Sequence, residues 1–187
     1  MKRFFSLIAL LITTLSFAQE TATFFCYEVD EFTDKKTLRA GSDLFFTDGG
    51  DMKSEGIVML VSVREGSKKK ENKIKSFSII AQVYGMKGCV DKGSTLDVIF
   101  EDGTKTQLVN WNDFSCEGTN YFDPSESQIQ MFKKSPIKAM RYTNKRSYAS
   151  ITIKDNISVS NKTFLQGRLV EMDDINSGSK KVDVCTE

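Results

Sequence analysis

Histidine is absent from this sequence, and proline and tryptophan are scarce, with two residues and one residue respectively. Without an imidazole group the chain has no Ser-His-Asp or Cys-His arrangement and no histidine ligand for zinc or iron. An enzyme built on these residues would have to use carboxylates, lysine or tyrosine. The absence therefore excludes the common histidine-dependent hydrolases and metalloenzymes.

Long apolar runs are also missing, apart from one near the N-terminus. Residues 4–12 are apolar except for Ser6, and they follow the cations Lys2 and Arg3. This run has the length of a signal-peptide core and is too short to span a membrane. No later run approaches the roughly eighteen apolar residues of a transmembrane helix, so we expect no membrane span in the mature chain.

Small side chains mark a cleavage site just after this run. Ser16 and Ala18 have the compact side chains that signal peptidase requires, which predicts cleavage after Ala18. We therefore expect residues 1–18 to be a signal peptide and residues 19–187 to form a single exported domain. Its expected location is the periplasm, the cell surface or the medium.

The charges of the expected mature chain nearly balance. Lys2 and Arg3 leave with the signal peptide, so 24 of the 26 basic residues remain against 25 acidic residues. The densest basic stretch, residues 68–75, contains Glu71 and no aromatic residue. It predicts a solvated hairpin loop, and we expect no nucleic-acid partner.

All four cysteines lie in the expected mature chain, and an even number in an exported protein indicates two disulfides. We prefer the pairs Cys89–Cys116 and Cys26–Cys185, of which the second would join the two ends of the domain. No two cysteines form a CxxC pair and no histidine is present, which disfavours a redox or metal role. We therefore expect structural disulfides and no cofactor.

The preference for Cys89–Cys116 comes from a turn signal midway between them. Residues 101–103, with the sequence Glu-Asp-Gly, predict a hairpin turn. A two-residue turn would place Cys89 directly opposite Cys116. A three-residue turn with its glycine in the left-handed conformation would pair Leu96 with Leu108 and leave the cysteines one position out of register, within reach after a bulge.

Short segments of aromatic and β-branched residues predict strands. Residues 57–63 are almost entirely apolar, which fits a strand covered on both faces at the centre of a sheet. Residues 76–84 alternate, with Phe77, Ile79 and their i+2 neighbours on one face, which indicates one buried face and one wet face. Further strands are expected at residues 24–29, within a hairpin over 94–110, and at 137–143 and 147–154, with a turn at 30–36.

The two prolines flank one predicted helix. Asp123 can cap this helix, Pro124 suits its first turn, and Glu126 completes a capping box. Pro136 prevents the helix from continuing past Ser135.

Helical spacing of Leu165, Leu169 and Met172 predicts a second helix over residues 160–175. Together these elements predict a mainly β protein of the α+β class. We expect an antiparallel sandwich or a partly open barrel, with one short inserted helix and a C-terminal helix.

One segment concentrates aromatic and polar side chains in a predicted loop. Trp111, Asn112 and Asp113 follow the hairpin, and Tyr121 and Phe122 lie shortly beyond Cys116. Aromatic faces beside amide and carboxylate groups can stack on a sugar or hold a peptide. The alternative interpretation, which we prefer, is that these rings plug the open end of the β core next to the disulfide.

Acidic residues around two glycines form a weak candidate pattern for a metal site. Asp48 and Asp51 flank Gly49 and Gly50, and such a loop can place carboxylates around calcium. The spacing does not match the twelve-residue calcium loop, and the same residues make an ordinary polar turn. We prefer the polar turn and predict no metal site.

Three short motifs are the signal ending Ser16, Phe17, Ala18, Gln19, the turn Asp30, Glu31, Phe32, Thr33, and Pro136 and Ile137 leading to Arg141. Together they resemble uncharacterised exported proteins of the Bacteroidota. This resemblance implies a periplasmic or surface location and no particular activity.

The sequence therefore predicts an exported, non-catalytic binding or envelope-associated protein, whose partner would be an unknown envelope component, a glycan or a protein. A carboxylate-dependent extracytoplasmic hydrolase is the first alternative, because glycosidase chemistry needs only two facing carboxyl groups. An inhibitor of an external enzyme is the second.

Overall fold

The structure is a computed structural model that describes residues 25–34, 36–40, 44–47, 56–65, 74–85, 89–154 and 157–185. The predicted signal peptide, the candidate calcium ligands Asp48 and Asp51, and most of the lysine-rich stretch lie outside these residues.

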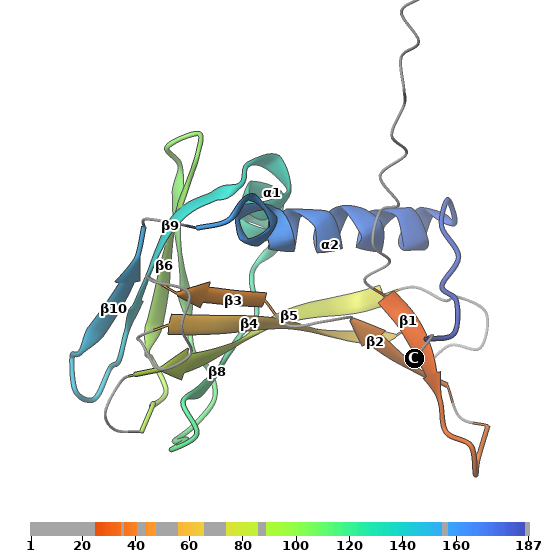
Figure 1. The fold of residues 1–187 in the computed structure, drawn as a ribbon, viewed down its shortest axis with the longest axis horizontal. Helices are drawn as coiled ribbons and strands as arrows, with labels where there is room; N and C mark the ends of the chain where they lie inside the picture. Colours follow the sequence, from red (N-terminus) through yellow and green to blue (C-terminus); the bar gives the residue numbers. More distant parts are fainter. Residues whose placement is uncertain are drawn as a thin grey trace, which may run out of the picture.

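Two four-stranded antiparallel sheets and one two-stranded sheet make up the described β structure, and their strands run in clearly different directions (Figure 1). We call the four-stranded sheets the β4–β5 sheet and the β6–β9 sheet. The β4–β5 sheet has the order β3 (Leu44–Thr47), β4 (Gly56–Glu65), β5 (Ile74–Tyr84), β8 (Thr119–Phe122). The β6–β9 sheet has the order β10 (Ser150–Ile153), β9 (Ile137–Thr143), β6 (Thr95–Phe100), β7 (Lys105–Val109). The small sheet pairs β1 (Phe25–Val29) with β2 (Lys36–Ala40).

Two helices pack against the four-stranded sheets on the side of the core. α2 (Val159–Ser177) runs along one face of the β4–β5 sheet and contacts β3, β5 and β9, while α1 (Glu126–Lys134) packs against α2 (Figure 1). No helix in the described part of the chain is both long and apolar enough to cross a membrane. The predicted class, an α+β fold with antiparallel sheets, one inserted helix and a C-terminal helix, is confirmed.

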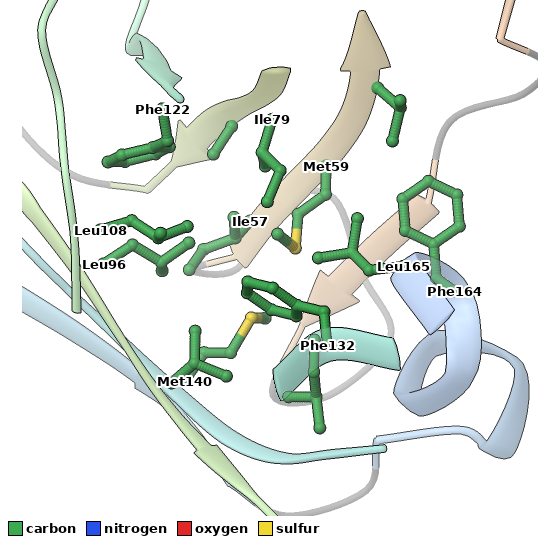
Figure 2. Packing of buried hydrophobic residues seen from close by; sticks show 14 of the residues in the cluster. Ile57, Met59, Ile79, Leu96, Leu108, Phe122, Phe132, Met140, Phe164 and Leu165 are labelled. Carbon is green, nitrogen blue, oxygen red and sulfur yellow. The ribbon is translucent and has the colours of Figure 1, made fainter. Parts of the chain in front are cut away.

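The core lies between the sheets and the helices, as the strand patterns predict. In β4 and β5 the paired residues Met59 and Ala81 face inward and are fully buried. Phe132 of α1 lies among side chains from both sheets, between Ile57 and Met140 (Figure 2). Burying one such phenylalanine stabilises a fold by about 1.5–3 kcal/mol.

The N-cap of α1 lies two residues later than the sequence predicts. Ser125 is the N-cap, and it forms a reciprocal capping box with Gln128. Asp123, the predicted cap, instead accepts a hydrogen bond of 2.6 Å from the Ser78 hydroxyl. Pro124 precedes the cap and is buried. The predicted end at Ser135 is correct.

The turn between β9 and β10 is longer than the predicted gap between residues 143 and 147. The Asn144 side chain accepts hydrogen bonds from the backbone N–H groups of Arg146 and Ser147, at 2.9 and 3.2 Å. Tyr148 adopts a positive φ of 57°. These contacts hold residues 145–149 in a turn, so β10 begins at Ser150 and the prediction of a strand from residue 147 is wrong there.

Two disulfides are present, and they are the pairs that the sequence analysis preferred. Cys89–Cys116 brackets the β6–β7 hairpin, in which Leu96 pairs with Leu108 as a three-residue turn requires. Beyond the hairpin Val90 pairs with Ser115, so the register shifts by one position before it reaches the cysteines.

The second disulfide, Cys26–Cys185, fastens the C-terminal segment to β1. Around it, the Tyr27 N–H donates to the Asp183 carbonyl at 2.8 Å, and the Cys185 N–H donates to the Tyr27 carbonyl at 2.9 Å. The segment between the end of α2 and Cys185 is therefore held against β1.

Candidate functional site

A buried amide holds the backbone on either side of Trp111. Asn110 is fully buried, and its Oδ1 accepts hydrogen bonds from the N–H groups of Tyr121 and Asn112, at 2.8 and 3.2 Å. Its Nδ2 donates to the carbonyls of Asp91 and Asn112, at 3.1 and 3.2 Å. All four interactions end on backbone groups, so one side chain fixes the course of the loop that carries Trp111.

A second buried amide joins the two sheets at the same end of the domain. The Asn120 Oδ1 accepts a hydrogen bond of 3.0 Å from the Tyr142 hydroxyl, and its Nδ2 donates to the Gly118 carbonyl at 3.1 Å. Burial raises the pKa of Tyr142, so its hydroxyl keeps the proton that it donates. A buried polar group destabilises the fold unless it is hydrogen-bonded. This network therefore favours a single arrangement of the chain around Asn120.

Trp111 itself faces outward. Its backbone N–H donates to the Tyr121 carbonyl at 3.2 Å, which extends the pairing along β8. The indole is 47% exposed and lies against the Tyr121 ring, with the ring centroids 5.6 Å apart and the planes tilted by 47°. The interpretation that the aromatic rings plug the core holds for Phe122, which is fully buried, but it is wrong for Trp111.

The exposed indole borders a groove with a volume of about 320 Å³. β5 contributes Lys75 and Ser78 to its lining, and the start of α1 contributes Glu126 and Ile129. Asp123 also lines it, held by the Ser78 hydroxyl. The groove therefore combines an aromatic face with two carboxylates, a hydroxyl and an ammonium group.

Of the four residues predicted to form a binding site, the structure brings two together. Trp111 lines the groove and Tyr121 supports its ring. Asn112 is half-buried with its backbone groups bound to Asn110, Asp113 is exposed, and neither lines the groove.

The polar lining of the groove is not among the residues that the sequence predicts for a site. Asp123 and Glu126 have a visible sequence signal, but that signal predicts helix capping. Ser78 lies on the polar side of an alternating strand, where a serine is unremarkable. Within the described ranges no group of three cysteine, aspartate or glutamate side chains is placed to hold a metal ion.

A larger groove lies on the outer face of the β6–β9 sheet, with a volume of about 560 Å³. Ile99 and Ala139 pair across β6 and β9 at its floor. Asp97 and Arg141 pair two residues away along the same strands, with the Arg141 Nη2 2.7 Å from Asp97 Oδ2. No prediction from the sequence pointed to this surface.

These features define a small α+β sandwich domain with two structural disulfides and two surface grooves, one of them bordered by the Trp111 indole. Comparisons of the chain with protein families, with curated proteins and with solved structures found no match.

Proposed function

We propose that this chain is an exported, non-catalytic binding protein and that the groove beside Trp111 binds a glycan. The signal-peptide pattern at residues 1–18 supports export, and the two disulfides fit an oxidising compartment. The domain would then meet its ligand outside the cytoplasm, in the envelope or in the medium.

The observation that carries the proposal is the half-exposed indole on a backbone that buried amides hold in place. An aromatic ring of this kind presents an apolar face to the C–H side of a sugar ring. Because the loop is already ordered, binding does not have to order it, and the affinity is not reduced by that entropic cost.

The polar groups beside the indole suit the hydroxyl groups of a sugar. The carboxylates of Asp123 and Glu126 accept hydrogen bonds, and Lys75 donates them. A few directed polar groups around an apolar contact are the usual composition of a small-molecule site. The groove therefore supports a glycan better than a wholly apolar ligand.

Replacement of Trp111 by alanine is expected to weaken glycan binding at least about tenfold, because it removes the stacking face and its buried apolar area. The purified chain would first be screened on immobilised oligosaccharides, and the affinity for a retained oligosaccharide would then be measured by titration calorimetry.

Phe114→Ala provides the matched control. Phe114 is 55% exposed and packs beside Arg146, 5.4 Å from the guanidinium, without lining the groove. The proposal requires that this variant bind like the parent chain. Equal losses in both variants, or no retained oligosaccharide at all, would contradict it.

A carboxylate-dependent hydrolase is the second candidate, because Asp123 and Glu126 line the same groove as the indole. Two carboxyl groups on either side of a glycosidic bond are sufficient for hydrolysis in most glycosidases. Prolonged incubation with the retained oligosaccharide, followed by measurement of reducing ends, separates the two functions.

Turnover that either Asp123→Asn or Glu126→Gln abolishes would establish the hydrolase and overturn the non-catalytic proposal. Saturable binding without release of reducing ends would favour the binding protein.

A further inference from the structure

We infer that the outer face of the β6–β9 sheet is a second ligand site, which binds a single-chain anionic amphiphile of the fatty-acid type. The inference does not depend on the Trp111 groove. It follows from the apolar floor, the charged rim and the size of the groove on this face.

The floor of this groove is apolar where a solvent-facing sheet surface is usually polar. Alternation along β6 turns Leu96, Val98 and Phe100 into the core, and it turns Ile99 outward. Ile99 pairs with Ala139 on β9, and both side chains are half-buried. These two residues form an apolar strip across the middle of the sheet.

The rim of the groove carries more positive than negative charge. Lys105 stands directly opposite Ile99 on β7, and Arg141 lies on β9. Asp97 is the acidic residue of the lining, and both of its oxygens are engaged, Oδ2 by Arg141 at 2.7 Å and Oδ1 by the Gln107 amide at 2.7 Å.

Lys105 is therefore the cation that this arrangement leaves for a ligand. No carboxylate among the described residues forms an ion pair with it. Arg141 directs Nε and Nη2 at Asp97, and its side chain is 59% exposed, so a ligand in the groove can still reach its guanidinium. A carboxylate placed between Lys105 and Arg141 would accept charge-assisted hydrogen bonds.

The volume and the apolar floor of the groove indicate what the ligand carries besides its carboxylate. Its volume of about 560 Å³ falls within the range of roughly 300–1,000 Å³ that is usual for small-molecule sites. The aliphatic stems of Lys105 and Arg141 can extend the apolar strip of Ile99 and Ala139 while their charged ends stay in water. An acyl chain along this strip, with its carboxylate at the rim, satisfies both features.

Dodecanoate, used below its micelle concentration, is the probe for this site. We expect saturable one-to-one binding in titration calorimetry, no comparable binding of dodecyltrimethylammonium, and affinity about tenfold weaker in Lys105→Gln. Ala139→Glu, which adds a negative charge to the floor, is expected to abolish binding. Circular dichroism of each variant would verify that its fold is retained.

Two control variants identify the site. Lys138→Gln removes an exposed cation of β9 that does not line the groove, and Trp111→Ala removes the indole of the other groove. Both should bind dodecanoate like the parent chain. The inference is overturned by the absence of saturable binding, by equal binding of the cationic amphiphile, by equal losses in the two lysine variants, or by a loss in Trp111→Ala.

Discussion

A chain in which Cys26 and Cys185 are both replaced by serine is expected to lose about 5 kcal/mol of unfolding free energy. The two cysteines are 159 residues apart in the sequence, so their bond restricts almost the whole unfolded chain. In the chain-entropy model the stabilisation grows with the logarithm of the loop length. Urea denaturation followed by circular dichroism would measure the loss.

The other disulfide provides the comparison. Cys89 and Cys116 are 27 residues apart, and the same model gives about 3.5 kcal/mol for their bond. We therefore expect the doubly substituted Cys89→Ser, Cys116→Ser chain to be the more stable of the two variants. The reverse order would show that local packing around the hairpin loop, and not chain entropy, dominates the contribution of these bonds.

Gly118→Ala is expected to destabilise the domain by about 2–4 kcal/mol. Gly118 is buried with a φ of +75°, and a Cβ added there would lie 2.6 Å from the Val83 carbonyl oxygen. The Val83 N–H also donates to the Gly118 carbonyl at 3.0 Å. An alanine side chain therefore adds the cost of the left-handed conformation, about 1–2 kcal/mol, to a clash that breaks this backbone pairing.

Gly103→Ala separates these two causes. Gly103 has a φ of +82°, but a Cβ added there meets nothing within 4 Å. Only the conformational cost applies, so the loss should be about 1–2 kcal/mol. Thermal unfolding of both variants tests the account, which would be wrong if the two glycine substitutions had the same effect.

Strand patterns predicted the sheets well where burial differs between the two faces. The alternation of β5 and the apolar run of β4 place Ile79 and Val61 in register on the core face. The turn signal at Gly103 also predicted two possible registers, and the β6–β7 hairpin has one of them. In these segments local sequence and tertiary packing require the same conformation, so the sequence is sufficient.

Other elements could not be predicted because their partners are distant in the sequence. The strands β2 and β3 received no strand prediction, and both depend on pairing with neighbouring strands. The cap of α1 is at Ser125 because Gln128 completes its capping box, while Asp123 is held by Ser78 on another strand. Asp123 and Ser125 are both suited to cap the helix, and contacts that form only in the folded chain determine which of them does.

In the C-terminal helix, the sequence pattern predicts the buried apolar residues but not the buried charged ones. Its apolar spacing predicted the burial of Leu165 and Leu169, but Arg168 and Glu171 are also buried. The Arg168 guanidinium lies 4.1 Å from the centroid of the Phe164 ring, and burial lowers its pKa to about 10. Lys180, beyond the end of the helix, pairs with Glu171 at 2.6 Å. Helical periodicity alone does not predict buried charges that are compensated in this way.

The two grooves also depend on residues that are distant from one another in the sequence. Trp111 was visible in the sequence as an aromatic residue in a polar loop, but the groove beside it also takes side chains from β5 and α1. The outer groove takes its floor and rim from strands that lie far apart in the chain. Alternation along β6 places Ile99 on the outer face, but only the sheet register shows that Ala139 lies beside it there.

Trp111 is the only tryptophan in the chain, so tryptophan emission reports on the groove beside it alone. The most direct test is a fluorescence titration of the intact protein with a retained oligosaccharide, with acrylamide quenching measured at both ends of the titration. Stacking of a sugar on the indole predicts a saturable change in emission at the calorimetric affinity, together with reduced quenching. An oligosaccharide that binds in the calorimeter but leaves the emission and the quenching of Trp111 unchanged would contradict the proposed site.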